Sequence, residues 1–259
     1  MAPLLDAPQW AAPKNVLAAM STRLGGISTT PFDSLNLGYS TPDNRNSVAA
    51  NEVKVAYALG IDPGAIRWVY QVHGNAVQLA ESLPENAPLG GAVIEGDAIV
   101  SRTPGLVCGV KVADCLPVLF SSVDGRVVAA AHAGWRGLAA GVLENTVSAM
   151  GCAAEDIVTW LGPCIGKDRF EVGGEVRSAF LEAASPANRD LIVASFQPLA
   201  SQEKYLCDLR SIASARLRAI GVSKIAVTHA CTFSEPARYF SHRRDRVTGR
   251  MAAFVGIKP

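Results

Sequence analysis

Apolar side chains recur with helical spacing in three stretches of the chain. In residues 47–60 this spacing ends at Gly60, and a glycine is a common stop signal just after a helix. Residues 137–151 show the same pattern and also end at a glycine. Residues 208–221 begin with Asp208, a preferred N-cap residue. The pattern predicts a helix in each stretch.

Short apolar runs between turn signals are typical of strands. One turn signal is the pair Asp124 and Gly125, which separates two of the runs. Residues 66–80 are rich in β-branched and aromatic side chains and break at Gly74, which predicts two short strands or one bent strand. The other predicted strands cover residues 98–101, 106–112, 116–121, 126–132, 156–166 and 224–233.

The remaining segments contain few regular patterns. Residues 20–44 are rich in Gly, Ser, Thr, Pro and Asn and are predicted to form turns and loops, and residues 81–97 form a Pro/Gly-rich connection. We find no internal repeat or low-complexity tract that would mark a boundary. We therefore expect an α+β fold in which residues 1–259 form a single domain, with mixed β-sheets layered against helices.

Composition and charge narrow the class of partner. The 49% hydrophobic and 18% charged residues are typical of a globular chain, and a net charge of +1 gives no reason to expect nucleic acid or a membrane as partner. The first residues lack the pattern of a signal peptide, and no apolar run is long enough to span a membrane. We expect a cytoplasmic protein that binds a small molecule and exists as a monomer or weak homo-oligomer. Its six cysteines are expected to be thiols.

A possible metal site begins at His132, where an apolar strand pattern ends before a predicted helix. The neighbouring glycines Gly134 and Gly137 would allow a ligand to approach the backbone closely. Two imidazoles and a thiolate are a known Zn²⁺ ligand set, and His73 and Cys115 complete such a set. The three residues are widely spaced in sequence, so spacing alone leaves open that His132 only bonds to a backbone carbonyl.

Nine short motifs resemble those of the laccase-like polyphenol oxidase family, in the family's order. They are STRLGGIS, LNLG, QVHG, GDAIVS, ADCLPVLF, AAAHAGWRG, LGPCIG, FEVG and FSHRRD followed by TGRMAAFVGI. Bacterial members are also described as purine nucleoside phosphorylases with adenosine deaminase and methylthioadenosine phosphorylase activity. The resemblance extends over residues 21–257.

The resemblance implies a zinc-dependent enzyme of mixed α and β structure. Its substrates would be inorganic phosphate and the purine nucleosides adenosine, inosine, guanosine and methylthioadenosine, with deamination of adenosine as a further reaction. The same resemblance implies that His73, Cys115 and His132 bind the metal and form the catalytic site. In one place the chain departs from many relatives, which carry an Asn-Arg pair in the early helix where this chain has Asn51 and Glu52. Arg45 lies nearby and could replace that arginine.

Other polar residues are candidates for binding substrate or phosphate. Arginine suits phosphate because its guanidinium can pair with two oxygens at once. Asp114 is a candidate for indirect support of the metal, Cys164 could approach the site from a turn, and His229 is expected to be structural. The candidates for substrate or phosphate binding are Arg23, Asn36, Arg136, His242 and Arg243, with Arg244 and Arg250 as further phosphate candidates.

Two other classes of enzyme remain open. A copper-dependent polyphenol oxidase could also use two histidines and a cysteine, although four histidines are too few for a multicopper cluster with a separate electron-entry site. A metal-free hydrolase could use Cys115 as its nucleophile. The HxE and PCxxC motifs of familiar zinc deaminases are absent from the sequence, so no general acid or base is assigned.

Overall fold

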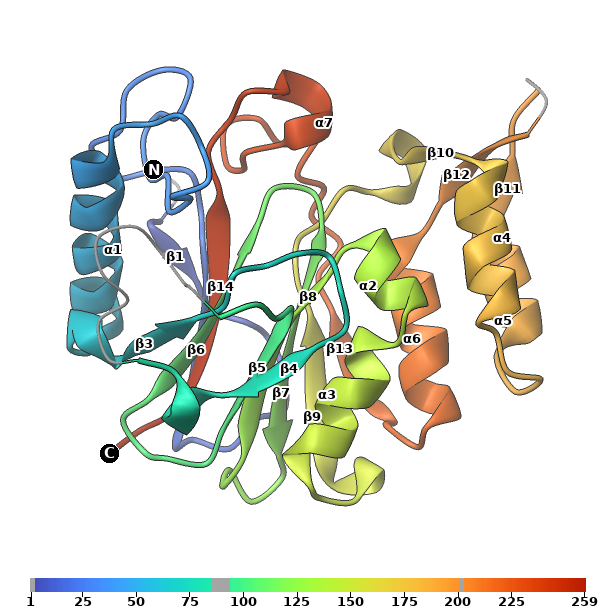
Figure 1. The fold of residues 1–259 in the computed structure, drawn as a ribbon, viewed down its shortest axis with the longest axis horizontal. Coiled ribbons are helices and arrows are strands. Elements are labelled where there is room, and N and C mark those ends of the chain that lie inside the picture. Colours follow the sequence, from blue (N-terminus) through green and yellow to red (C-terminus); the bar gives the residue numbers. More distant parts are fainter. Residues whose placement is uncertain (1–2, 85–93, 201–202) are drawn as a thin grey trace.

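Two β-sheets pack face to face at the centre of the fold, with helices outside both of them. The computed structural model describes residues 3–84, 94–200 and 203–259. From left to right, Figure 1 shows α1 (Arg45–Leu59), the two sheets, and then α3 (Val142–Met150) and α6 (Leu209–Ala219). This arrangement confirms the expected α+β fold with mixed sheets layered against helices.

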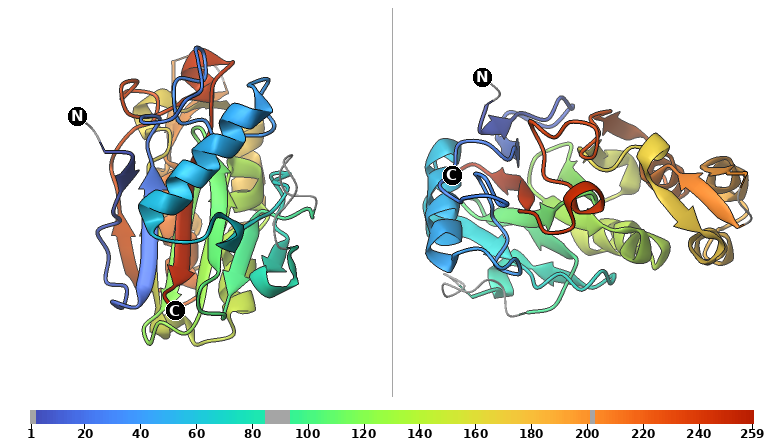
Figure 2. Two further views of the ribbon diagram at one scale, coloured as in Figure 1. Left: turned by 90° about the vertical axis from the view of Figure 1, so that its left-hand side faces the viewer. Right: turned by 90° about the horizontal axis from the view of Figure 1, so that it is seen from above.

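The first sheet has five strands in the order β1-β2-β14-β6-β3. It is mixed, because β3 runs parallel to β6 while the other neighbours are antiparallel. Figure 2 shows α1 crossing its outer face. The strands are β1 (Leu5–Asp6), β2 (Val16–Ser21), β3 (Ile66–Trp68), β6 (Val107–Val112) and β14 (Met251–Ile257).

The second sheet has six strands in the order β13-β9-β7-β8-β5-β4. It is also mixed, with parallel pairs at both edges and antiparallel pairs in the middle. Its strands are β4 (Val77–Leu79), β5 (Ala98–Ser101), β7 (Leu116–Ser122), β8 (Val128–Ala133), β9 (Ile157–Leu161) and β13 (Lys224–Val227). Between the two sheets lies a core that includes Val110, Leu119 and Val255, all fully buried.

A smaller antiparallel sheet extends from the side that carries α6, as Figure 1 shows. Its strands are β10 (Glu171–Gly173), β11 (Phe196–Pro198) and β12 (Lys204–Cys207). The remaining α-helices of the described chain are α2 (Trp135–Ala139), α4 (Gly174–Glu182), α5 (Arg189–Ala194) and α7 (His242–Asp245). Among the described helices, none combines the length and apolar character needed to cross a membrane.

Helix termini follow the signals in the sequence. The Asn44 side chain accepts hydrogen bonds at the start of α1, and Gly60 ends the helix in the left-handed conformation at φ 72°. Asp208 accepts hydrogen bonds from two backbone N–H groups at the start of α6, as predicted. The single helix predicted over 137–151 is wrong, because Gly141 at φ 92° separates α2 from α3.

The strand predictions are confirmed in position and differ at their ends. The stretch 66–80 forms two short strands, β3 and β4, and 98–101 coincides with β5. The runs 156–166 and 224–233 are strands only as far as Leu161 and Val227. Elements without a prediction are β1, β2, β10, β11, β12, β14, α4, α5 and α7.

Loops and cysteines also follow the sequence. Residues 22–44 contain turns and no helix or strand, while β2 includes the first two residues of the stretch 20–44. Part of the connection at 81–97, namely 85–93, lies outside the described residues. The six cysteines all fall within the described ranges and are free thiols.

Candidate functional site

Strand register brings three possible metal ligands together at one edge of the six-stranded sheet. Leu116 pairs with Ala133, which places Cys115 beside the end of β8, where His132 lies. His73 comes from the loop before β4, and that strand runs beside β5. The ligand atoms of His73, Cys115 and His132 all lie within 4.8 Å of one another.

The three side chains differ in their exposure. His132 is buried, Cys115 is partly buried and His73 is exposed. The Nε2 atom of His73 lies 3.8 Å from the Cys115 sulfur, and the two imidazole rings meet edge to face with centroids 4.8 Å apart. The cluster therefore has a buried inner histidine and an exposed outer histidine on its open side.

The buried carboxylate of Asp97 fixes both histidines. It accepts a hydrogen bond of 2.8 Å from Nδ1 of His132, so the other ring nitrogen is left to face the cluster. It also holds the loop that carries His73, because it accepts hydrogen bonds from the backbone N–H groups of Val72, His73 and Gly74. Sequence reasoning missed Asp97, although it is the aspartate of the GDAIVS motif, directly before β5.

Electrostatics favour the ionised form of the cysteine. Burial raises the pKa of the Cys115 thiol, but His132 and His73 outweigh this effect and lower its pKa to about 6. Burial lowers the pKa of His132, but the thiolate of Cys115 and the carboxylate of Asp97 raise its pKa to about 9. A thiolate, which is the form that binds metals, is thus stabilised at neutral pH.

Two glycines allow the elements of the site to approach one another. A Cβ atom on Gly134 would lie 2.8 Å from Cδ2 of His73 and 3.2 Å from the Cys115 sulfur. A Cβ atom on Gly137 would lie 2.4 Å from the carbonyl oxygen of Gly74, so this glycine lets α2 pack against the loop of His73. Both glycines serve the convergence of the ligands.

Gly134→Ala should therefore weaken metal binding. The added methyl group would push the exposed His73 ring away from Cys115, and we expect metal affinity to fall at least tenfold in a chelator competition titration. Gly74→Ala is the matched control, because a Cβ atom there would meet its nearest neighbours at 3.5 Å, an ordinary contact. Equal affinities for the two variants would contradict this explanation of Gly134.

The donor set suits a tetrahedral metal ion with one open position. Zinc takes imidazole nitrogens at about 2.0–2.1 Å and thiolate sulfur at about 2.3 Å, so its ligand atoms lie about 3–4 Å apart. The separation of 3.8 Å between His73 and Cys115 agrees with this geometry. His73, Cys115 and His132 therefore offer a donor set that would hold such an ion, and all three line the adjoining cavity.

That cavity has a volume of about 720 Å³, which is sufficient for a nucleoside. It has aromatic rings, cationic side chains and the three possible ligands in its lining. Its lining includes Tyr39, Arg45, Tyr70, His73, Lys111, Cys115, His132, His242 and Arg250.

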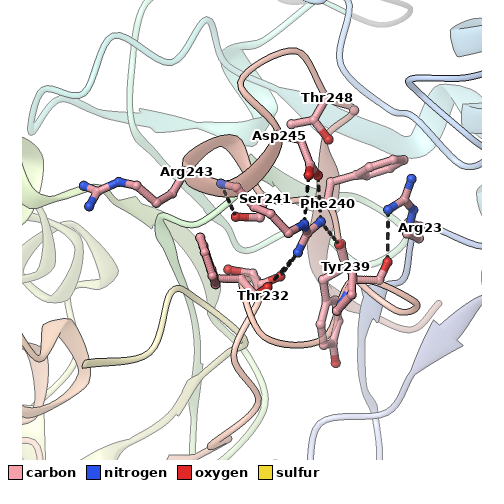
Figure 3. A network of polar contacts seen from close by, with 12 residues as sticks. Arg23, Thr232, Tyr239, Phe240, Ser241, Arg243, Asp245 and Thr248 are labelled. Carbon is pink, nitrogen blue, oxygen red and sulfur yellow. Dashed lines mark hydrogen bonds and ion pairs between the residues drawn. The ribbon is translucent and has the colours of Figure 1, made fainter. Parts of the chain in front are cut away.

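Several predicted binding residues lie elsewhere. Arg136 is exposed and stacks its guanidinium on Trp135 at 4.3 Å, and it is not among the described residues that line the cavity. Arg23 donates to the carbonyl oxygens of Asp33 and Pro236 and packs on the ring of Phe240 (Figure 3). The structure thus places both arginines in contacts within the protein.

Asp114 lies at the centre of a polar network at the start of α7. Its carboxylate accepts hydrogen bonds from the hydroxyls of Thr232 and Ser241 and from the backbone N–H of Arg243. Asp114 has φ 95°, which turns the chain sharply just before Cys115. It therefore holds the turn that presents Cys115 to the His–Cys–His cluster.

The C-terminal arginines mainly brace this network. Figure 3 shows the Arg243 side chain extending away from Ser241, and its guanidinium donates to the carbonyl oxygen of Glu171. Arg244 donates to the carbonyl oxygens of Thr232, Phe233 and Tyr239. The guanidinium groups of Arg243 and Arg244 thus donate hydrogen bonds to backbone carbonyl oxygens of the protein.

Asn36 and Arg250 form a connected pair. The buried Asn36 side chain accepts a hydrogen bond from the backbone N–H of Arg250 and one from that of Gly38. The Arg250 guanidinium donates to the carbonyl oxygens of Thr248 and Gly249. Asn36 thus positions Arg250, which lines the cavity, and does not line it itself.

Of the other candidates, His242 lines the cavity, whereas Cys164 is fully buried outside its lining and donates to a carbonyl oxygen.

Glu52, where this chain departs from many relatives, contacts two residues that line the cavity. Glu52 pairs with Lys111 at 3.1 Å and accepts a hydrogen bond from the Tyr39 hydroxyl. Lys111 was missed by sequence reasoning, because a lone lysine in a strand carries no motif.

Fold and site together define an α+β protein with a His–Cys–His cluster of possible metal ligands beside a cavity. The chain belongs to the family described as multi-copper polyphenol oxidoreductase laccase, whose model matches residues 17–258.

Known proteins that resemble this chain cover almost its whole length. It is 47% identical over 253 residues to purine nucleoside phosphorylase YfiH of Escherichia coli K12, and the aligned region covers 98% of each chain. It is 43% identical to purine nucleoside phosphorylase PA4543 of Pseudomonas aeruginosa, with 97% of each chain covered. The crystal structure of Neisseria meningitidis protein NMB0706 matches with a TM-score of 0.90 and 38% identity, over 99% of this chain and 100% of that one.

Proposed function

We propose that this protein is a zinc-dependent purine nucleoside phosphorylase acting on adenosine, inosine, guanosine and methylthioadenosine. The observation that carries the proposal is the convergence of His73, Cys115 and His132 at a cavity of nucleoside size. Relatives named purine nucleoside phosphorylase, similar over nearly the whole chain, support the choice of reaction.

His73, Cys115 and His132 would hold the zinc ion, with Asp97 orienting the inner histidine. When bound, zinc would supply Lewis-acid stabilisation of negative charge on the reacting groups. The protein must also hold phosphate against C1′ of the ribose and exclude competing water.

Arg250 and Lys111 are our candidates for holding phosphate. Both line the cavity, and Arg250 is a largely buried cation. Burial lowers its pKa below the usual value and outweighs the opposite effect of the nearby Cys115 and Asp114. Lys111 already pairs with Glu52, so its positive charge is shared. Arg250 therefore offers the stronger anion site, since within the described residues its guanidinium donates hydrogen bonds only to the neutral carbonyl oxygens of Thr248 and Gly249.

Arg250→Ala should raise the KM for phosphate in phosphorolysis by at least tenfold and affect deamination of adenosine less, because deamination uses water. Arg136→Ala, which removes an exposed guanidinium outside the cavity lining, should change neither reaction by more than twofold. Steady-state kinetics on inosine and adenosine provide the measurement. The opposite ranking of the two variants would return the phosphate role to Arg136.

The purine is proposed to lie near Tyr39 and Tyr70, whose rings line the cavity and can stack with a base. A departing purine also needs a proton or hydrogen-bond donor at a ring nitrogen. His242 lines the same cavity and is our candidate for that donor. Deamination of adenosine, which we also propose, would replace phosphate with water directed at C6.

Copper-dependent oxidation of phenols is the second candidate, favoured by the family description. Two histidines and a cysteine also suit copper. The number of histidines argues against it. The chain has four, of which His73 and His132 are in the cluster, and this is too few for a multicopper cluster with a separate electron-entry site. A metal-free hydrolase with Cys115 as nucleophile is the third, supported by its lowered pKa.

Product chromatography distinguishes these candidates. Freshly purified protein should convert inosine to hypoxanthine only with phosphate, and metal analysis should give about one zinc per chain. Oxygen-dependent oxidation of a phenol without any nucleoside cleavage would favour the copper enzyme. Full turnover of an ester substrate without metal would favour the hydrolase.

We further propose that residues 1–259 act as one domain, in the cytoplasm, as a monomer or weak homo-oligomer. The six free thiols support a reducing environment. A formal net charge of +1 supports small molecules as partners, with neither nucleic acid nor a membrane required.

A further inference from the structure

A second cavity of about 600 Å³ lies on the side of the fold that carries α6. Its lining comes from one face of α6, the turn at residues 167–169, the end of α5 and the segment after β13. The described residues of its lining include none of those that line the metal-site cavity. His229, expected to be structural, is exposed and lines this second cavity.

A buried arginine lies against this cavity. The Arg210 residue is only 8% exposed, and Nη2 of its guanidinium donates to the carbonyl oxygens of Cys164 and Ala230. Its Nε atom is buried and has no hydrogen-bond partner within the described part of the chain. Arg210 forms no ion pair of 4.0 Å or less within the described residues, and a buried cation in that state is costly, so a bound anion would stabilise this group.

Charges around Arg210 favour an anion further. Lys167, Arg169 and Arg218 also line the cavity, opposed by two carboxylates, those of Asp168 and Asp208. The Asp208 carboxylate already accepts hydrogen bonds from the backbone N–H groups of Arg210 and Ser211 and from the Ser211 hydroxyl. Its negative charge is thus engaged in capping α6, and the lining keeps an excess of positive charge.

Part of the lining is apolar or weakly polar. Leu191 and Val227 present aliphatic side chains, and Ser214 supplies a hydroxyl one turn along α6 from Arg210. A purely inorganic anion would leave these aliphatic surfaces without a partner. The lining therefore suits a ligand with one charged end and a small apolar body.

We propose that the second cavity binds a small organic oxyanion, with its phosphate or carboxylate group near Arg210, Lys167 and Arg218 and its apolar body against Leu191 and Val227. This site is distinct from the metal centre and does not depend on the function proposed there. The segment of Cys164 and Ile165 contacts both sites. The carbonyl oxygen of Cys164 accepts a hydrogen bond from Arg210, and the backbone N–H of Ile165 donates one to the carbonyl oxygen of Asp114.

Calorimetric titration with phenyl phosphate and with benzoate tests the proposal on the full-length protein. The wild type should bind at least one of them, and which one it binds distinguishes a phosphate from a carboxylate ligand. Lys167→Ala/Arg218→Ala should lower the affinity at least tenfold, since both side chains are exposed and their removal leaves the core intact. Arg126→Ala/Lys224→Ala, which removes two exposed charges outside both cavity linings, should bind as the wild type does.

Three outcomes would overturn the proposal. The first is that the wild type binds neither probe. The second is that the Lys167→Ala/Arg218→Ala variant binds with unchanged affinity, or that the control variant loses as much affinity. The third is that Arg250→Ala alone abolishes binding, which would place the probe in the metal-site cavity.

Discussion

Cys115→Ala should lower phosphate-dependent cleavage of inosine by more than about 100-fold, because loss of a metal ligand should exceed the roughly 10- to 100-fold effect of disturbing a group behind the ligands. The fold should be largely preserved, since the partly buried thiol lies at an open site. We expect Tm to fall by no more than about 4 °C, equivalent to about 1 kcal/mol in a domain of this size.

Cys152→Ala is the matched control for this substitution. Cys152 is a partly buried free thiol in the segment after α3, outside both cavity linings. Its replacement should leave both turnover and metal content unchanged. Full activity in Cys115→Ala on every nucleoside would refute both the zinc enzyme and the cysteine hydrolase.

Asp97→Asn should cause the second large effect, on metal affinity and on stability together. The two carboxylate oxygens of Asp97 receive four donors, the ring of His132 and three backbone N–H groups. An asparagine offers one oxygen and one NH₂ group, so at least one of these donors loses its acceptor. Each lost acceptor costs about 1–3 kcal/mol in a buried site.

We expect the zinc affinity of Asp97→Asn to fall by about 10- to 100-fold in a chelator competition titration. Asp208→Asn is the control, because that carboxylate also receives backbone N–H groups but lies at the start of α6. It should keep wild-type zinc affinity, since asparagine caps helices almost as well as aspartate. Unchanged affinity in Asp97→Asn would mean that His132 is oriented by packing alone.

The sheets were predictable where local pattern and tertiary contacts agree. Residues 98–101 form β5 as predicted, because an apolar run buried on both faces has no competing helical period. The helix predicted over 137–151 failed at Gly141, since spacing of apolar residues cannot reveal a positive φ. The strands between residues 170 and 207 have only 3 or 4 residues, and such short elements depend on packing that no local window contains.

The convergence of the three candidate ligands was predictable from the sequence, whereas the residues that support them were less so. His73, Cys115 and His132 have unusual chemistry, and strand register brings them together as the ligand set requires. The sequence cannot reveal the direction of a long side chain. It therefore favoured Arg136 over Arg250, whereas the structure places Arg136 on Trp135 and Arg250 at the cavity. Asp97 went unnoticed because an aspartate before a strand is typical of an ordinary turn.

Metal removal and replacement tests the zinc-dependent phosphorylase most directly. Protein treated with a chelator and then dialysed should lose phosphate-dependent release of hypoxanthine from inosine, and one equivalent of Zn²⁺ per chain should restore it. An undiminished rate of phosphorolysis in protein shown to contain no metal would contradict the role assigned to His73, Cys115 and His132.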